Sequence, residues 1–365
     1  MLFNLWAHLS YFLTDFSLYL ILLLISFGLL VAGSYKVYKS NSSPKRKKLL
    51  VSVFFTLFCL ILIFSFFEAY FRYRYDISDG LGFLKVNQRW QNRHIVFNSD
   101  FFRDRNFGPK KENTTRICAI GDSVTQGGGI KKVNDRFTNL LENKLQNAGY
   151  SAEVYNLGKS GYDTDGEKEI YEKTKFLNCD IVVWEYFLND VQPEGQSTGT
   201  RIIANSSKES KIASSLSNRS FFFDYLYWRL STRYTKTFKA LNNADLSQYN
   251  NPPVFTHHLA TIKAWSDEMK TDNKKVIVII FPFVHLLPNY PAAEIHQRMD
   301  KAFQDNGLNV IDLLDDLKGK NGSDLIASKF DYHPNETVHK IAADRLFEEV
   351  KKLMPSQNSK PGAGQ

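Results

Sequence analysis

Residues 117–130 read Ile-Cys-Ala-Ile-Gly-Asp-Ser-Val-Thr-Gln-Gly-Gly-Gly-Ile, and this stretch decides how the chain folds. The apolar run Ile117–Ile120 predicts a short buried strand, and the three glycines Gly127–Gly129 predict an exposed turn soon after it. That turn presents Ser123. A serine hydroxyl is a poor nucleophile at neutral pH, so it needs a base to take its proton and donors to hold the oxyanion that forms. Other parts of the chain must supply these groups.

From Thr115 onward, apolar runs alternate with segments of helical pattern. The predicted strands are 116–121, 152–157, 180–187, 275–282 and 308–313, and the predicted helices are 135–148, 164–178, 255–272, 291–306 and 336–353. Short buried strands separated by helices predict an α/β domain at 115–354, with about five parallel strands in a three-layer α/β/α arrangement. Right-handed crossovers place the carboxyl end of every strand along one edge, where such sheets form their sites.

Polar residues follow several of these strands. Gly161 lies in a loop of small residues after the second strand, where a free backbone N–H can face an anion. Asn189 follows the third strand, and its amide can donate a further hydrogen bond. His333 stands after the fifth strand, directly before the last helix, and Asp331 can hold its other ring nitrogen. The sequence thus predicts a base and two donors on the same edge as Ser123.

Each of these residues also has an ordinary structural explanation. A histidine before a helix is usually a surface or capping residue, and Asn-Asp after a strand is usually a turn. Their shared position at strand ends favours a site. The remaining histidines compete less well, because they lie at a helix start, in an apolar loop or inside the last helix (His257, His258, His285, His339).

The blocks Gly121-Asp122-Ser123, Gly161, Asn189-Asp190 and Asp331-x-His333-Pro334-Asn335 resemble those of the SGNH/GDSL hydrolase superfamily, over about residues 98–354. The resemblance implies a flavodoxin-like fold with Ser123 as nucleophile, His333 as base and Asp331 as its partner. It also implies an oxyanion hole made by the Ser123 N–H, the Gly161 N–H and the Asn189 side chain. No metal or organic cofactor is implied.

The chain departs from the family pattern in two places. Phe187 and Leu188 precede the Asn-Asp pair where many members have glycine, which would narrow the pocket. Asp331 stands two residues before His333 rather than the familiar three. The shorter spacing resembles that of membrane-tethered members that act on surface polysaccharides.

The N-terminal part predicts two transmembrane helices, at about 16–35 and 49–67. Ser17–Gly33 and Leu49–Phe67 carry no charged residue and are long enough to cross a hydrocarbon core of roughly 30 Å. A pair of buried core helices is the alternative, but both runs are apolar on every face. A cleaved signal peptide fits poorly, because no Lys or Arg precedes the first run.

Positive charge is concentrated between these two runs. Six of the eight excess charges lie in the loop 36–48, as Lys36, Lys39, Lys45, Arg46, Lys47 and Lys48. A short basic loop stays in the cytoplasm, so the chain is predicted to be a multi-pass membrane protein whose C-terminal domain is extracytoplasmic, periplasmic or extracellular. Because little excess charge remains elsewhere, nucleic acid is not expected as a partner.

The other segments give weaker signals. The connector 69–114 is expected to be irregular, with Phe97–Arg103 docking against the domain. The insertion at about 191–253 holds a polar loop and an aromatic, basic segment at 221–241 that predicts a lid, a helix on the membrane surface, or a helix packed on the domain. The tail 355–365 is expected to be disordered. The three cysteines, Cys59, Cys118 and Cys179, predict neither a disulfide framework nor a metal site.

Together these features predict a membrane-anchored serine esterase that cleaves an acyl ester, expected to be short-chain, on a cell-envelope polysaccharide or lipid. Two alternatives stay open. A polysaccharide O-acetyltransferase would use the same residues and would need a multi-spanning partner to supply the acyl group. A non-catalytic envelope scaffold would keep the fold without turnover.

Overall fold

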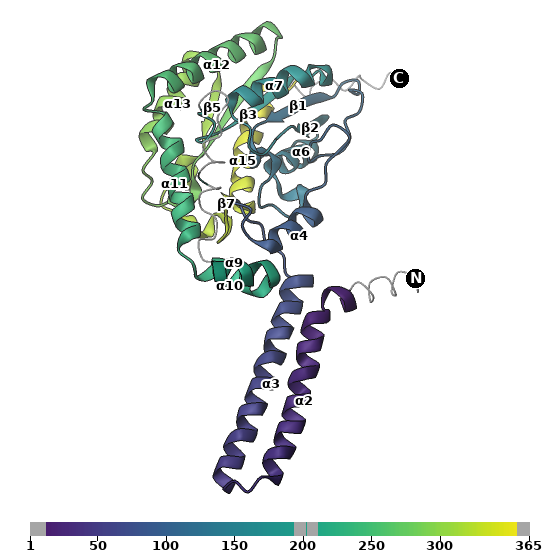
Figure 1. Ribbon diagram of the computed structural model, residues 1–365. Helices are drawn as coiled ribbons and strands as arrows, with labels where there is room; N and C mark the ends of the chain where they lie inside the picture. Colours follow the sequence, from purple (N-terminus) through teal and green to yellow (C-terminus); the bar gives the residue numbers. More distant parts are fainter. Residues whose placement is uncertain (1–11, 193–201, 203–210, 356–365) are drawn as a thin grey trace, which may run out of the picture. The chain divides into compact units, whose positions relative to one another are not determined.

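The computed structural model describes residues 12–192, 202 and 211–355, and it divides into two compact units (Figure 1). One unit contains the chain up to Asp76 together with Lys208–Leu230, and the other contains Ile77–Ser207 and everything from Ser231 onward. The predicted disordered tail, beyond its first residue, and most of the predicted polar loop lie outside the described residues.

The second unit is built on a five-stranded parallel sheet, as the sequence predicted. The strands lie in the order β2-β1-β3-β4-β5, which is the flavodoxin-like order. Their bounds are β1 (Thr115–Ile120), β2 (Ala152–Asn156), β3 (Ile181–Phe187), β4 (Lys275–Phe281) and β5 (Asn309–Asp312). Every residue of β3 is buried, which explains why the strands read as continuous apolar runs rather than alternating ones.

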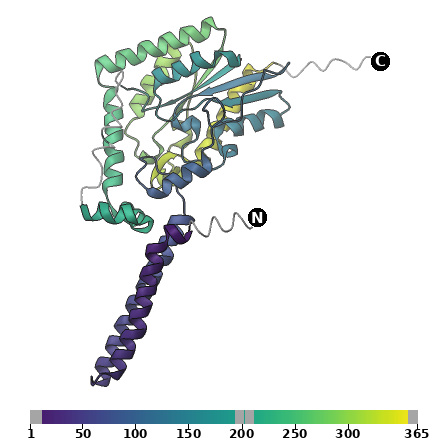
Figure 2. The ribbon, with the colours of Figure 1, turned by 45° about the vertical axis from the view of Figure 1, so that its right-hand side comes forward.

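Helices cover both faces of the sheet (Figure 1 and Figure 2). Trp184 of β3 packs on Trp265 and Phe303 with ring centroids 4.1 and 5.0 Å away, which identifies the face covered by α12 and α13. On the other face Phe137 packs against Phe281, with centroids 5.8 Å apart. The first layer contains α7 (Thr164–Thr174), α12 (Pro252–Thr271) and α13 (Ala293–Asp305), and the second contains α6 (Phe137–Asn147) and α15 (Glu336–Leu353).

The strand order creates a switch point between β1 and β3. From β1 the chain moves outward to β2, and from β2 it crosses back to β3 on the other side of β1. The loops after β1 and β3 therefore diverge at the carboxyl edge and leave room for a site between them. Ser123 and Asn189 lie in these two loops.

A small hairpin that the sequence did not predict carries Asp331 and His333. Strands β6 (Ile326–Ser328) and β7 (Asp331–Pro334) pair antiparallel and stand apart from the main sheet. A loop was expected here, directly before the last helix. Strands of three and four residues are too short to give a clear alternation of apolar and polar positions, so nothing in the pattern marked them.

The expectation that the cysteines form no disulfide was wrong. Cys118 in β1 and Cys179 just before β3 are bonded, with Cα atoms 5.9 Å apart. The bond joins neighbouring strands across 61 residues of sequence, so it follows from the sheet order and not from any local spacing of cysteines. Cys59 is a free thiol.

The connector is more regular than predicted. It contains α4 (Lys85–His94), which buries Val86 and Trp90 one turn apart. Only these two positions carry an apolar signal, which is too little for a helical period to stand out. The expected docking of Phe97–Arg103 is confirmed in part, because Phe102 and Arg103 are buried while Phe101 remains 74% exposed.

The insertion folds into α9 (Lys211–Arg219), α10 (Phe221–Leu230) and α11 (Arg233–Gln248). The aromatic segment is therefore two helices, and α10 belongs to the first unit while α11 belongs to the second. Within the first unit, Phe222 of α10 stacks on Phe67 with ring centroids 5.1 Å apart. Whether α10 acts as a lid, lies on the membrane surface or packs on the sheet domain stays a prediction.

The first unit is a hairpin of α2 (Ser17–Lys39) and α3 (Pro44–Tyr73). Both helices are long and apolar enough to cross a membrane, and only 11% and 6% of their most apolar windows are buried. The predicted basic loop 36–48 is mostly helical, because the turn occupies only residues 40–43 and Pro44 starts α3 at a position where proline is favourable. The lysines extend the two helices instead.

Glu68, near the C-terminal end of α3, forms hydrogen bonds with the start of α10. Its fully buried carboxylate accepts hydrogen bonds from the Ser220 hydroxyl at 2.6 Å and from the backbone N–H groups of Phe221 and Phe222 at 3.1 and 3.0 Å. These N–H groups belong to the first turn of a helix, where a negative charge is favourable. Arg72 pairs with Glu68 at 2.9 Å, so the buried charge is compensated.

Candidate active site

The nucleophile turn is a strand-to-helix junction. After β1, Asp122 caps the short helix α5 (Ser123–Gln126) by accepting the Val124 N–H at 2.7 Å. Ser123 is the first residue of this helix and is 7% exposed. Its hydroxyl lies 3.1 Å from Asp122 Oδ2, and its own N–H has no acceptor among the described residues. The turn thus presents a hydroxyl and a backbone donor together.

The structure brings His333 and Asp331 to this hydroxyl. His333 Nε2 lies 2.9 Å from Ser123 Oγ, and His333 Nδ1 lies 2.5 Å from Asp331 Oδ1. Asp331 also accepts the backbone N–H of His333 at 3.1 Å. With the proton on Nδ1, the imidazole can accept the serine proton at Nε2 while the carboxylate fixes the tautomer.

The two-residue spacing between acid and base follows from β7. Residues i and i+2 of a strand point to the same face, so Asp331 and His333 stand side by side in this extended segment. The intervening Tyr332 turns away and stacks on His285, with ring centroids 4.6 Å apart. A spacing that looks short in the sequence is the natural one for a strand.

The glycine triplet after the nucleophile makes room for both partners. A Cβ at Gly128 would meet Cγ and Cδ2 of His333 at 3.0 Å, so the imidazole lies directly on the peptide backbone. Gly129 has φ +78°, and a Cβ there would lie 3.2 Å from Asp331 Oδ2. Only glycine allows the approach at the first position and the backbone conformation at the second.

The two predicted oxyanion donors are placed differently. Asn189 faces the nucleophile turn, with Nδ2 3.4 Å from Asp122 Oδ2, and its buried Oδ1 has no partner among the residues that the structure describes. Gly161 has φ +81° and is exposed, and its N–H makes no hydrogen bond within the described chain. Among the contacts of the described residues, none joins Gly161 to Ser123 directly. Its turn is held to the end of β1 by the Lys159 N–H, which donates to Gly121 O at 3.1 Å.

The charges of the histidine and the aspartate are linked. Burial alone would raise the pKa of Asp331, but the charge and hydrogen bonds of His333 outweigh it, so this pKa is lowered. Burial alone would lower the pKa of His333, whereas the charge and hydrogen bond of Asp331 raise it above the usual value. The pair therefore favours an imidazolium next to a carboxylate.

Two buried arginines hold the glycine turn, and neither role was predicted from the sequence. Arg103 donates to Gly127 O at 2.6 Å and to Ile130 O at 2.7 Å. Arg136 donates to the backbone carbonyl of Arg103 and thereby supports the segment that carries the Arg103 side chain. Burial lowers the pKa of each to about 10. Nothing in the local sequence distinguishes these arginines from surface residues.

Buried carboxyl groups lie beneath the turn. Glu185 of β3 accepts the Thr125 hydroxyl at 2.9 Å and the Asp122 N–H at 3.3 Å. Burial, reinforced by the charge of Asp122, raises its pKa well above the usual range. The position of Glu185 inside the apolar run Ile181–Phe187 was the sequence signal that could have identified this residue, because a buried acid needs a specific partner.

Three other histidines, His258, His285 and His339, are accounted for by packing. Burial lowers the pKa of His285 to about 4 and of His258 and His339 to about 3. His339 accepts the Phe137 N–H at 3.2 Å, and His258 bonds the Tyr186 hydroxyl at 3.0 Å. None of these bonds reaches Ser123. Within the described part of the chain no group of three or more His, Cys, Asp and Glu side chains could hold a metal ion; the expected absence of a cofactor stays a prediction.

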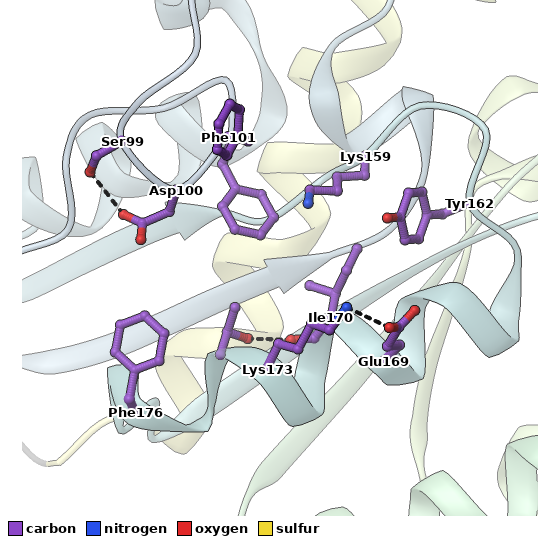
Figure 3. A pocket seen from close by; sticks show the side chains of 11 residues that line it. Ser99, Asp100, Phe101, Lys159, Tyr162, Glu169, Ile170, Lys173 and Phe176 are labelled. Carbon is purple, nitrogen blue, oxygen red and sulfur yellow. Dashed lines mark hydrogen bonds and ion pairs between the residues drawn. The ribbon is translucent and has the colours of Figure 1, made fainter.

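A cavity of about 350 Å³ lies beside the Gly161 turn. Figure 3 shows Lys159 and Tyr162 of this turn at one end, Asp100 and Phe101 on the loop that forms one wall, and Phe176 on the opposite wall. Phe101 and Phe176 are 74% and 68% exposed. Lys159 Nζ lies 4.8 Å from the centroid of the Phe102 ring, and no carboxylate of the described residues is within ion-pair distance of it. The cavity therefore combines exposed aromatic faces with polar groups, next to the Gly161 turn.

Comparison with known proteins agrees with this geometry. Residues 119–341 match the model of the GDSL-like lipase/acylhydrolase family. Among solved structures, the chain is similar to a lipase/acylhydrolase from Enterococcus faecalis (15% identity, 67% of this chain and 100% of that one, TM-score 0.41). It is also similar to the psychrotrophic esterase EstA from Pseudoalteromonas sp. (15% identity, 66% and 98%, TM-score 0.39).

A two-domain esterase active on acetylated mannans is matched as well (14% identity, 69% of this chain and 53% of that one, TM-score 0.40). No curated protein matches significantly. The match to the family model extends over more than half of the chain and includes the nucleophile turn, the switch-point loops and the β6–β7 hairpin. The chain belongs to the GDSL-like lipase/acylhydrolase family, and it is a hydrolase of ester bonds.

Proposed function

We propose that this protein is a membrane-anchored serine esterase that removes a short acyl group from an ester on a cell-envelope polysaccharide. The observation that carries the proposal is the line of contacts from Ser123 Oγ through the His333 ring to the Asp331 carboxylate, at 2.9 and 2.5 Å.

The reaction follows from these contacts. Ser123 Oγ attacks the ester carbonyl while His333 Nε2 takes the hydroxyl proton, and Asp331 stabilises the imidazolium that forms. The N–H groups of Ser123 and Gly161 and the Asn189 amide receive the oxyanion, and removing one such donor costs about 3 kcal/mol of transition-state stabilisation. His333 then protonates the departing alcohol. Water, deprotonated by the same imidazole, cleaves the acyl-enzyme and releases the acid.

The cavity beside the Gly161 turn supports a polysaccharide rather than a lipid as the alcohol component. Exposed aromatic faces such as those of Phe101 and Phe176 stack on the apolar faces of sugar rings, and Lys159 and Asp100 can bond to hydroxyl groups. An aliphatic chain would leave these polar groups unpaired. A neighbouring sugar unit of the polymer is therefore the proposed occupant.

The location is part of the proposal. Two apolar helices with outward-facing side chains support membrane anchoring, and the basic residues at their connected ends support a cytoplasmic turn. The Cys118–Cys179 disulfide supports an oxidising compartment for the hydrolase domain. A reporter fused after Gln365 should be active only outside the cytoplasm, and cytoplasmic activity would overturn the proposed sidedness.

Labelling with a fluorophosphonate probe tests the nucleophile. The wild-type protein should be labelled at Ser123, and the Ser123→Ala variant should lose both labelling and p-nitrophenyl acetate hydrolysis. Ser151→Ala removes an exposed hydroxyl just before β2, at the sheet edge opposite Ser123; it serves as the matched control and should keep both. Folded protein that is not labelled at Ser123 would contradict the proposal. If sugar hydroxyls outcompete water as the acyl acceptor, the polysaccharide O-acetyltransferase replaces the esterase as the proposed function.

A further inference from the structure

The loop 98–106, called the arginine loop below, precedes the family-matched part of the chain, yet it contacts the glycine turn that follows the nucleophile. Its shape is set locally, because Asn98 Oδ1 accepts the Phe102 N–H at 2.9 Å and the Asn98 N–H donates to Phe102 O at 2.8 Å. Asp104 ties it to the end of β2 by accepting the Asn156 N–H at 2.7 Å. None of these bonds uses a guanidinium group, so the loop is held in place by other contacts.

One side chain of this loop spans the whole glycine turn. The Arg103 guanidinium is fully buried and donates to Gly127 O at 2.6 Å and to Ile130 O at 2.7 Å. Two longer contacts, each of 3.4 Å, reach the carbonyl oxygens of Gln126 and Lys131. A guanidinium holds its donors in a rigid planar fork. A single side chain therefore sets the distance between the two ends of the turn.

The glycine turn has little conformational preference of its own. Gly127 and Gly129 have φ values of +86° and +78°, and glycine loses more conformational freedom on ordering than any other residue. Two hydrogen bonds of the turn end on the nucleophile, because the N–H groups of Gly127 and Gly128 donate to Ser123 O at 3.1 and 2.7 Å. A shift of the turn therefore acts directly on the backbone of Ser123.

The same turn supports the base and the acid. A Cβ at Gly128 would lie 3.0 Å from two ring atoms of His333, and a Cβ at Gly129 would lie 3.2 Å from Asp331 Oδ2. The imidazole and the carboxylate thus lie against consecutive residues of the turn. Nucleophile, base and acid all contact the segment that the guanidinium fixes.

The surroundings of Arg103 do not favour stability. Its hydrogen bonds in the described chain all go to neutral carbonyl oxygens, and its buried Nε has no partner among the described residues. Burial lowers its pKa to about 10. A buried charge that lacks a carboxylate partner costs folding free energy, whereas an apolar side chain of similar length would fill the space without this cost. The arrangement fits a role in the site better than a role in stability.

We propose that Arg103 is a positioning residue of the esterase site. Its guanidinium fixes the Gly127–Ile130 turn, and the turn sets the place of the His333 imidazole against Ser123 Oγ. The arginine loop thereby supports the site although it precedes the family-matched residues. The inference rests on the proposed function, because it assigns Ser123 and His333 the roles of nucleophile and base.

Arg103→Lys tests this role. Lysine keeps the buried charge, but its single ammonium group does not reproduce the fork that bridges two carbonyl groups. The value of kcat for p-nitrophenyl acetate should fall about ten-fold, since a shift of a few tenths of an ångström costs less than the roughly 100-fold of about 1 Å. KM should change little, because the turn positions the base and not the ester. Arg103→Met fills the space without a charge and should lower kcat at least as much.

The matched control is Arg116→Lys at the amino end of β1. Arg116 is also buried and also bridges two carbonyl groups, donating to Leu177 O at 2.6 Å and to Gly108 O at 2.9 Å. Its replacement is expected to lower the melting temperature and to leave kcat unchanged. If Arg116→Lys lowers kcat as much as Arg103→Lys does, general loss of packing is responsible and the proposal fails. Wild-type kcat in folded Arg103→Lys and Arg103→Met proteins overturns it as well.

Hydrogen exchange separates this inference from the proposed function. The Gly127 and Gly128 amides donate to Ser123 O, and their exchange can be followed by mass spectrometry on the full chain in detergent micelles. Peptides from this turn should exchange several-fold faster in Arg103→Lys and at the wild-type rate in Arg116→Lys. If the wild-type protein hydrolyses no ester but this change is observed, the proposed function fails while the positioning contact stands. Unchanged exchange in Arg103→Lys refutes the positioning role in either case.

Discussion

Replacing Gly128 by alanine should damage catalysis while leaving the fold intact. The new Cβ would lie 3.0 Å from two ring atoms of His333, about 0.4 Å inside the lower limit of ordinary contact. The backbone φ of Gly128 is not positive, so the methyl group adds no backbone strain. The neighbouring atom belongs to an imidazole held at both ends, and the ring must therefore move by several tenths of an ångström.

The expected loss of kcat/KM follows from that displacement of the imidazole ring. His333 Nε2 is now 2.9 Å from Ser123 Oγ, and a shift of a few tenths of an ångström to one ångström lengthens or tilts this contact. A misplacement of about 1 Å can cost about 100-fold in rate, so kcat/KM should fall about 10- to 100-fold, or about 1.4–2.7 kcal/mol in activation free energy.

The assay is steady-state hydrolysis of p-nitrophenyl acetate, with thermal unfolding measured on the same samples. Gly108→Ala is the matched control, because a Cβ at Gly108 meets nothing within 4 Å and its φ is not positive. It should keep wild-type kinetics. If Gly128→Ala keeps kcat/KM within about two-fold of wild type while folding normally, the contact between the glycine and the imidazole does not position the base.

Three further predictions concern titration, covalent structure and the cavity. Activity should be lost as pH falls through the pKa of His333, because the imidazole must be neutral to accept the serine proton. This pKa lies above the usual 6.5. A pH profile of kcat/KM with its acidic limb below 6.5 would contradict the prediction. Cys118→Ala should lower the free energy of unfolding by up to about 4 kcal/mol, since the bond to Cys179 closes a loop of 61 residues, and denaturant unfolding of oxidised and reduced protein measures the difference. Phe101→Ala should raise KM several-fold for O-acetylated polysaccharides from a panel of soluble glycans and leave KM for p-nitrophenyl acetate unchanged. Phe97→Ala, which removes another exposed ring, is the control. Equal KM values for the polymers in both variants would exclude the cavity as a sugar site.

The parts of the fold that sequence could predict are those with strong local patterns. The five main strands are continuous apolar runs because both faces of the sheet are covered, and the residues after them become candidates for the site by position alone. Ser123, His333 and Asp331 were reached in this way, and His333 contacts both of the others. Their catalytic roles stay predictions that the variants above test.

The features that the sequence analysis missed depend on contacts between distant segments. Ser78 meets the β6–β7 hairpin at Ser328 across 250 residues of sequence, and the disulfide joins strands that are neighbours only in space. Arg103 was seen as part of a docking piece, but its bonds to the carbonyl groups of the glycine turn have no local signature. Such contacts follow from the tertiary arrangement, which no single window of sequence contains.

The extended conformation of β7 restricts how the spacing of acid and base can change. Inserting or deleting one residue between Asp331 and His333 would turn the carboxylate to the opposite face of the strand, away from the imidazole. A lineage with the two-residue spacing therefore cannot drift to the three-residue spacing through a single indel without rebuilding the hairpin. Sequence patterns that require a fixed three-residue interval will overlook the acid in chains of this kind, whereas a pattern that allows two residues within a short strand will find it.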